Sequence, residues 1–226
     1  MPLRHSLVWL DAEGWRAVLA QTPACFHADV IRWGEADWPL TVRRQDAGCS
    51  SDQLCLGVAL PPLLNGDKIR LPFRVAQSVI IRSRPPLLLS HIAPGLPQRW
   101  RDAAIRLYEA AQQSGNSVQV FGSAAMQSIT GLAYLHAASD LDLLLQPSTL
   151  QQLADCVQLF RTFDQQLPLD GEIIFGATVA VALREWCNAA DQEGGFRVLV
   201  KQAAGVALMQ KDALISLLEC PTCMPT

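Results

Sequence analysis

Two aspartates, Asp140 and Asp142, stand two positions apart in the run Asp140-Leu141-Asp142-Leu143-Leu144-Leu145. The alternation at the start of this run is typical of a β-strand, on which residues two apart point to the same face. Two carboxylates on one face repel each other unless a positive charge lies between them. Proteins commonly hold Mg²⁺ with one or two carboxylates together with substrate phosphates. The pair therefore predicts a Mg²⁺ site, with an exposed polar strand face as the alternative interpretation.

Gly122 and Ser123 follow a strand-like stretch from Ser117 to Phe121. Ser123 is placed to cap a short helix from Ala124 to Thr130, which Gly131 would end. A helix N-terminus that presents a hydroxyl and backbone N–H groups suits a terminal phosphate. We therefore predict that Gly122 and Ser123 bind phosphate beside the two aspartates.

A second pair of acids, Asp170 and Glu172, lies near the start of a strand predicted from Leu169 to Phe175. A third carboxylate could complete the shell of a metal ion or accept a proton during in-line transfer of a phosphoryl group. The two acids share a parity, so both could face the site. The sequence does not decide between them.

The elements that must position these residues alternate between helices and strands. An amphipathic run from Gln98 to Gln113 follows Pro97, and a further helix is expected from Leu150 to Phe163. The order is helix, strand, Gly-Ser turn, helix, Asp-x-Asp strand, helix and acidic strand. We therefore predict an α/β (α+β) domain over residues 95–226.

Residues 1–94 have a different character, and we expect a smaller, strand-containing domain there, joined to the other around the region from Pro85 to Pro97. Asn65-Gly66 between the runs Leu54–Pro62 and Lys68–Val75 is the strongest short signal for a β-hairpin. Residues 1–94 hold ten Lys/Arg and eight Asp/Glu, a net charge of +2, which leaves −5 for the rest of the chain.

The second run of this hairpin places Lys68, Arg70 and Arg74 on one face and apolar residues on the other. Pro72 predicts an edge strand, because proline cannot donate a ladder hydrogen bond. The cations could form a phosphate-binding stripe or the solvated outer face of that edge strand. The same two interpretations apply to Arg43 and Arg44, which follow a possible strand at residues 40–42.

Composition excludes several classes of protein. Of the 226 residues, 17% are charged and 50% are hydrophobic, and the formal net charge is −3, which argues against a disordered chain and against a polybasic nucleic-acid binder. No apolar run approaches the roughly 18 residues of a membrane span, and no signal-peptide stretch is visible, so we expect a cytoplasmic protein without a membrane partner. No P-loop, Rossmann glycine fingerprint or Gly-x-Ser-x-Gly motif is present.

The cysteines and the Arg184-Glu185 pair are expected to have structural roles only. The odd count of seven cysteines predicts reduced thiols, most of them in the core. Cys220 and Cys223 have the spacing of a zinc half-site but no second Cys-x-x-Cys and no nearby histidine. Arg184 and Glu185, beside Trp186, are expected to form a surface ion pair on a helix.

The Gly-Ser turn followed by Ser139-Asp140-Leu141-Asp142-Leu143-Leu144 resembles the signature of the nucleotidyltransferase superfamily related to DNA polymerase beta. The longer stretch from Phe121 to His136 narrows the resemblance to the malonate decarboxylase holo-acyl-carrier-protein synthases, which are the phosphoribosyl-dephospho-CoA transferases. Supporting pieces span nearly the whole chain: Arg4-His5, Val8-Trp9-Leu10, Pro39 to Arg44, Leu56 to Pro61, Lys68-x-Arg70, Asp170-Gly171-Glu172, Arg184-Glu185-Trp186 and Val198 to Lys201.

The resemblance implies a nucleotidyltransferase-like mixed sheet with flanking helices, preceded by the smaller domain. It further implies transfer of phosphoribosyl-dephospho-CoA from triphosphoribosyl-dephospho-CoA to a serine of the malonate decarboxylase acyl-carrier subunit, with release of diphosphate. Mg²⁺ would be held by Asp140 and Asp142, and Asp170 or Glu172 would activate the serine. The remaining phosphate charge, or an acidic carrier protein, would be bound by the cations Arg43, Arg44, Lys68, Arg70 and Lys201.

Two alternatives to this function remain open. The same core could act on a different acceptor, in which case the nucleotidyltransferase chemistry would be kept and the carrier subunit would not be its partner. The chain could also be a catalytically idle nucleotidyltransferase-like module that binds a partner. Against the idle module, the turn glycine and serine and the acidic pairs are all present.

Overall fold

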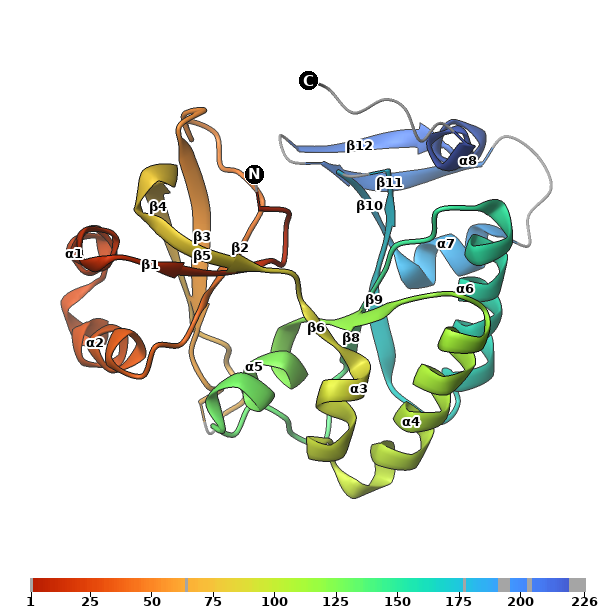
Figure 1. Ribbon diagram of the computed structural model, residues 1–226, viewed down its shortest axis with the longest axis horizontal. Coiled ribbons are helices and arrows are strands. Elements are labelled where there is room, and N and C mark those ends of the chain that lie inside the picture. Colours follow the sequence, from red (N-terminus) through yellow and green to blue (C-terminus); the bar gives the residue numbers. More distant parts are fainter. Residues whose placement is uncertain (1, 64, 177, 191–195, 203–204, 220–226) are drawn as a thin grey trace. The chain divides into compact units, whose positions relative to one another are not determined.

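The computed structural model describes residues 2–63, 65–176, 178–190, 196–202 and 205–219, and the chain divides into two compact units (Figure 1). The first unit runs to Pro86 and also takes in the segment Ile129–Tyr134, and the second holds the rest. The division falls between Pro86 and Leu87, within the proline-containing region in which the sequence places the junction.

The first unit contains a five-stranded antiparallel sheet in the order β4-β3-β2-β1-β5. The predicted hairpin is confirmed, because β3 and β4 pair from Gln53–Ala76 to Ala59–Arg70. The edge position of β4 and its alternation of exposed and buried residues are confirmed as well. The strands are β1 Leu7–Leu10, β2 Leu40–Val42, β3 Gln53–Ala59, β4 Arg70–Ala76 and β5 Ile80–Arg84.

Two helices accompany this sheet, α1 Ala12–Gln21 and α2 His27–Glu35, with 3₁₀ turns at Ala24–Phe26 and Gln77–Val79. Asp11 caps α1 by accepting a hydrogen bond from the Gly14 N–H at 2.8 Å. Tyr134, from the later segment of the unit, donates its hydroxyl to the Ala59 carbonyl at 2.7 Å. This bond fastens the segment after α5 to the end of β3.

The second unit contains a seven-stranded mixed sheet in the order β12-β11-β10-β9-β8-β7-β6. Its strands are β6 Leu87–Leu88, β7 Val118–Val120, β8 Leu141–Leu145, β9 Leu169–Phe175, β10 Val179–Ala182, β11 Arg197–Gln202 and β12 Gly205–Gln210. Among the described strands, β8 and β9 form the one parallel pair, and α6 makes the crossover between them.

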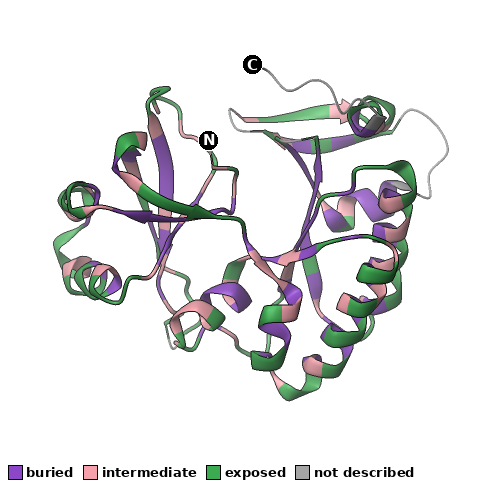
Figure 2. Cartoon of the chain, in the orientation of Figure 1, coloured by how far each residue is buried: buried purple, intermediate pink, exposed green. Residues whose placement is uncertain are grey.

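Helices pack on one face of this sheet, where α4 and α6 run side by side (Figure 1). The apolar residues of α4, α6, α7 and α8 form one core with the alternate strand residues Leu143, Ile173, Val181 and Val200. Figure 2 shows the buried inner and exposed outer sides of these helices. Their bounds, with those of the shorter helices, are α3 Leu89–Ile92, a 3₁₀ turn at Ala93–Gly95, α4 Gln98–Gln113, α5 Gly122–Thr130, α6 Leu150–Phe163, α7 Leu183–Ala190 and α8 Lys211–Glu219.

The opposite face of the same sheet, here named the carboxylate face, carries the residues of the other parity. Strand registers place on it the side chains of Asp142, Leu144, Asp170, Glu172, Ile174, Ala180, Leu199, Lys201, Val206 and Leu208. The mixed α/β fold with a smaller preceding strand-containing domain is thus as the sequence predicts.

Two local predictions are wrong. Ser123 is not an N-cap, because α5 begins at Gly122, whose left-handed backbone with φ of +67° turns the chain directly into the helix. Arg184 and Glu185 do not pair with each other, since adjacent residues on a helix do not face one another. Arg184 pairs with Asp164, and Glu185 accepts a hydrogen bond from the Leu199 N–H.

Five cysteines in the described part of the chain carry free thiols, and three of them, Cys55, Cys156 and Cys187, are buried. Burial raises the pKa of the Cys156 thiol to about 12, which makes it unreactive. The spaced pair Cys220 and Cys223 lies outside the described residues. Within those residues, no helix has the length and apolar character needed to cross a membrane.

Candidate active site

The parallel pairing of β8 and β9 brings two of the predicted acids side by side. Asp142 is the register partner of Asp170, and the next residues of the same parity, Leu144 and Glu172, are also partners. Asp140 immediately precedes β8 and is exposed. Its neighbour Ser139 is buried, and the Ser139 hydroxyl accepts a hydrogen bond from the His136 N–H at 3.0 Å. The two acidic pairs of the sequence therefore gather at one end of the carboxylate face.

The Gly-Ser turn lies against the Asp142 carboxylate. The Phe121 N–H donates to the Asp142 carbonyl at 3.0 Å, which ties the turn to β8. A Cβ atom on Gly122 would collide with a carboxylate oxygen of Asp142 and lie 2.9 Å from its Cγ. Glycine is thus required here both by the positive φ and by the closeness of the carboxylate. The turn and the aspartate therefore lie against each other, while their shared role in binding phosphate and metal stays a prediction.

Gly171 makes the close pairing of the two acidic strands possible. Its φ is +140°, and a Cβ atom at this position would lie 2.6 Å from the Leu143 nitrogen. The Gly171 N–H donates at 2.8 Å to Oδ1 of Asp170, which orients that carboxylate. Asp170 itself is exposed, so a substrate can reach it. The glycine between the two acids therefore sets the position of Asp170 relative to Asp142.

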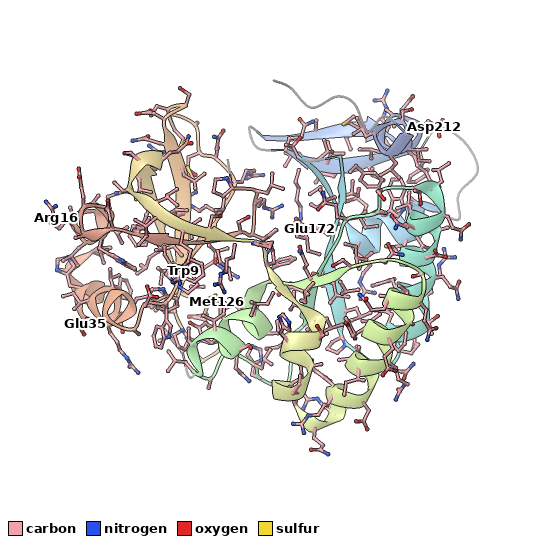
Figure 3. All side chains as sticks on the ribbon, viewed as in Figure 1. Trp9, Arg16, Glu35, Met126, Glu172 and Asp212 are labelled. Atoms are coloured by element: carbon pink, nitrogen blue, oxygen red, sulfur yellow. The ribbon has the colours of Figure 1, made fainter. Side chains whose placement is uncertain are left out.

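Glu172 has a different environment from Asp170. It is buried, with its residue 3% exposed, and its Oε1 accepts a hydrogen bond from Nζ of Lys201 at 2.8 Å. Figure 3 labels Glu172 on the side of the sheet away from α4 and α6. Beyond this pair, Leu144, Ile174 and Ala180 form a small apolar cluster with Phe121. Glu172 is thus a buried residue that forms an ion pair with Lys201, two residues further along β9 than Asp170.

Arg184 lies at the start of β9, next to the acidic residues, and local sequence patterns do not predict this position. Its Nη2 donates to the Leu169 carbonyl and to Oδ1 of Asp164, both at 2.8 Å. The hydrogen bond to Asp164 is the main cause that raises the pKa of Arg184, and the charges of Asp170 and Asp140 raise it further. The guanidinium therefore fixes the start of β9 and lies within the field of both carboxylates, whose mutual repulsion it reduces.

The predicted phosphate-binding cations are divided between the two units. Lys201 lies in the second unit with the acids and the turn, whereas the other four lie in the first, at Arg43, Arg44, Lys68 and Arg70. Arg43 donates to both carboxylate oxygens of Asp46, with Nη2 at 2.6 Å from Oδ2, and its Nε donates to the Leu56 carbonyl. Arg44, Lys68 and Arg70 are exposed. A phosphate-binding role for these four stays a prediction.

The donor set can be compared with what Mg²⁺ requires. In the described part of the chain, no three His, Cys, Asp or Glu side chains converge closely enough to hold a metal ion by themselves. Mg²⁺ is usually held by one or two carboxylates and completes its octahedron with water and substrate phosphates. Asp142 lies against the Gly122 turn, and Asp140 is two residues away. These residues fit a site in which two carboxylates and the phosphates of a substrate hold Mg²⁺ together.

Comparison with known proteins identifies the family to which this arrangement belongs. Residues 87–212 match the model described as the phosphoribosyl-dephospho-CoA transferase MdcG C-terminal domain, and residues 3–86 match the corresponding N-terminal domain. The chain belongs to the phosphoribosyl-dephospho-CoA transferase family. The two matched segments meet at residues 86 and 87, where the structure also divides.

Curated members of the transferase family align over almost the full chain. A phosphoribosyl-dephospho-CoA transferase of Xanthomonas campestris pv. campestris (strain 8004) is 36% identical over 213 residues, covering 93% of this chain and 95% of its own. One from Bradyrhizobium diazoefficiens is 31% identical over 218 residues, with 95% and 93% covered. No solved structure matches the chain. As a member of this family, the chain is a transferase enzyme.

Proposed function

We propose that this transferase moves phosphoribosyl-dephospho-CoA from triphosphoribosyl-dephospho-CoA to a serine hydroxyl of the acyl-carrier subunit of malonate decarboxylase. The serine oxygen forms a bond to the innermost phosphorus of the triphosphate, and the bond from that phosphorus to the outer two phosphates breaks. Diphosphate leaves, and the serine proton passes to a carboxylate of the enzyme. The product is a phosphodiester.

One observation carries this proposal: Asp142 and Asp170 are register partners on adjacent parallel strands, with the Gly122 turn against the Asp142 carboxylate. In-line transfer needs groups that orient the phosphates and a base near the attacking hydroxyl. The turn supplies backbone donors for the phosphates, and the neighbouring strand supplies the base. Bound Mg²⁺ would be held by Asp140 and Asp142 and would supply neutralisation of the phosphate charge.

Asp170 is the better candidate for the base than Glu172. Asp170 is exposed and lies directly beside Asp142, whereas Glu172 is buried and already neutralises the ammonium of Lys201. A base must be within hydrogen-bond reach of the substrate hydroxyl, which a buried and ion-paired carboxylate cannot satisfy without losing its partner. Glu172 then holds Lys201 in place, and Lys201 remains a candidate for a substrate phosphate.

The test is intact-mass spectrometry of the apo acyl-carrier subunit after incubation with the enzyme, Mg²⁺ and triphosphoribosyl-dephospho-CoA, with ATP in a parallel reaction. A mass gain equal to phosphoribosyl-dephospho-CoA is expected, and the Asp142→Asn variant serves as the inactive control. A gain with ATP alone would keep nucleotidyl transfer and reject this donor. No gain with either donor would contradict the proposal.

A further inference from the structure

Asp140 is held differently from the other acids of the site. Asp142 and Asp170 lie within β8 and β9 and are register partners, whereas Asp140 precedes β8, so the strand ladder does not fix it. Asp140 and Asp142 are two residues apart, and their like charges repel each other. If the two carboxylates are to hold one ion, as the proposed function requires, contacts outside the ladder must keep Asp140 in place.

A hydrogen-bonded turn at residues 136–139 ends immediately before Asp140. The Ser139 N–H donates to the His136 carbonyl at 3.1 Å, and the His136 N–H donates to Oγ of Ser139 at 3.0 Å. Within the turn, the Ala138 N–H donates to Nδ1 of the His136 ring at 3.2 Å. Ser139 therefore closes the turn twice, once with its backbone N–H and once with its side-chain hydroxyl.

Buried residues anchor the chain on both sides of Asp140. Ser139 is 2% exposed and Leu141 is 0% exposed, whereas Asp140 between them is exposed. The Leu141 N–H donates to the Pro168 carbonyl at 2.8 Å, which ties one side of Asp140 to the residue before β9. The Ser139 hydroxyl provides the tie on the other side. Its removal would leave the His136 N–H without this acceptor, so the turn would lose one of its two closing bonds.

We propose that Ser139 is a positioning residue for transfer: the hydrogen bond from the His136 N–H to its hydroxyl holds the Asp140 carboxylate beside that of Asp142, against their mutual repulsion, so that the two bind a divalent cation together. This inference rests on the proposed function, because it takes Asp140 and Asp142 to be the residues that hold Mg²⁺. In this role Ser139 touches neither the substrate nor the ion. Residues that orient metal ligands in this way typically contribute a factor of about 10 to 100 in metal affinity.

The experiment measures the Kd of Mn²⁺, a paramagnetic probe for the Mg²⁺ site, by electron paramagnetic resonance with neither donor nor carrier present. Ser139→Ala removes the acceptor, and we expect the Kd to rise about tenfold. Ser139→Cys keeps a side chain of similar size with a weaker acceptor, so its Kd should lie between those of Ser139→Ala and wild type. Thr149→Ala is the matched control, because the Thr149 hydroxyl accepts a hydrogen bond of the same kind, from the Gln152 N–H at 3.1 Å, beyond the other end of β8. Thr149→Ala should leave the Kd unchanged.

Asp140→Asn tests whether Ser139 acts through the aspartate. In the Ser139→Ala, Asp140→Asn double variant, the Kd should equal that of Asp140→Asn within about twofold, because the group that Ser139 positions is already gone. Transfer measured by intact mass gives a second readout. Ser139→Ala should need about tenfold more Mg²⁺ for half-maximal rate, while its rate at saturating Mg²⁺ stays within about threefold of wild type.

Several results would overturn this role for Ser139. An unchanged Kd in Ser139→Ala would show that the hydrogen bond does not position Asp140. An equal rise in Thr149→Ala would attribute the effect to a general loss of stability, and effects that multiply in the double variant would show that Ser139 does not act through Asp140. Absence of Mn²⁺ binding by the wild-type enzyme would reject both this role and the metal site. Failure of transfer to the carrier, with the changes in Kd as expected, would reject only the proposed acceptor.

Discussion

Replacing the two acids of β9 one at a time should separate a catalytic carboxylate from a structural one. Asp170→Asn keeps an oxygen that can accept the Gly171 N–H, so the strand geometry should survive. Because Asp170 is exposed, we expect no loss of stability. Loss of a general base typically slows transfer by 10² to 10⁴, which corresponds to about 3 to 5 kcal/mol in the activation free energy. The rate per folded molecule should fall by that factor.

Glu172→Gln should have the opposite effect, a loss of stability with little loss of transfer. The Glu172 side chain is 4% exposed and that of Lys201 is 31% exposed, with 2.8 Å between Oε1 and Nζ. Removing one partner of a fully buried ion pair costs about 3 to 5 kcal/mol, but Lys201 can turn its ammonium toward water. We therefore expect a loss of about 2 kcal/mol in the free energy of unfolding, with transfer by the folded fraction reduced less than tenfold.

Urea denaturation followed by circular dichroism measures the free energy of unfolding, and intact-mass time courses measure transfer. Lys201→Met gives a matched stability control, because the loss in the Glu172→Gln, Lys201→Met double variant should be smaller than the sum of the single losses. The reasoning would be refuted if Glu172→Gln folded with wild-type stability and lost transfer by 10³, or if Asp170→Asn transferred at the wild-type rate.

Three further changes are expected to have specific effects. Asp142→Ala should abolish transfer, measured by intact mass, with an unchanged unfolding midpoint, since removing one of several repelling carboxylates opens no core cavity; retained transfer would reject the site. Gly122→Ala should cost at least about 1 kcal/mol for a left-handed alanine and should also displace the Asp142 carboxylate, so kcat should fall far more than stability; an unchanged kcat would contradict this. The hydrogen bond from Arg43 lowers the pKa of Asp46 to about 2, below its unfolded value, so this carboxylate stabilises the fold above about pH 4 and loses that effect as the pH falls toward 2. Asp46→Asn should therefore be less stable than wild type at pH 7 by about 1 kcal/mol or less, because the pair is partly exposed, and urea titrations should show the difference shrinking by pH 3.

The spacing of polar and apolar residues was sufficient to predict most elements of the second unit. Helix Gln98–Gln113, helix Leu150–Phe163 and strand Leu169–Phe175 have the predicted bounds, because each carries a clear periodicity and ends at proline, glycine or a polar residue. The hairpin of the first unit followed from its Asn-Gly turn. Local patterns fix these elements because they concern neighbours in the sequence.

Strand order and ion-pair partners could not be predicted in the same way, because they depend on contacts between distant residues. Nothing near Glu172 in the sequence indicates that Lys201, 29 positions away, neutralises it. The sequence therefore left Asp170 and Glu172 equivalent, and only the register of β8 with β9 and the position of β11 distinguish them. The exposure of Leu199 and Leu208 on β11 and β12 could likewise not be predicted, since a continuous apolar run is typical of a strand that is buried on both faces.

Arg184 connects two elements of the site that are separated in the sequence. The guanidinium is held by Asp164 at the end of α6 and by the Leu169 carbonyl at the start of β9, so it joins the crossover helix to the acidic strand. The same group lies in the field of Asp140 and Asp170. Without a cation there, the carboxylates of Asp140 and Asp170, which we propose to act in transfer, would repel each other more strongly. The position of Asp170 beside Asp142 thus depends on the hydrogen bond from the Gly171 N–H to Asp170 and on the hydrogen bond from Arg184 to the Leu169 carbonyl. Neither contact can be predicted from the acidic motif alone.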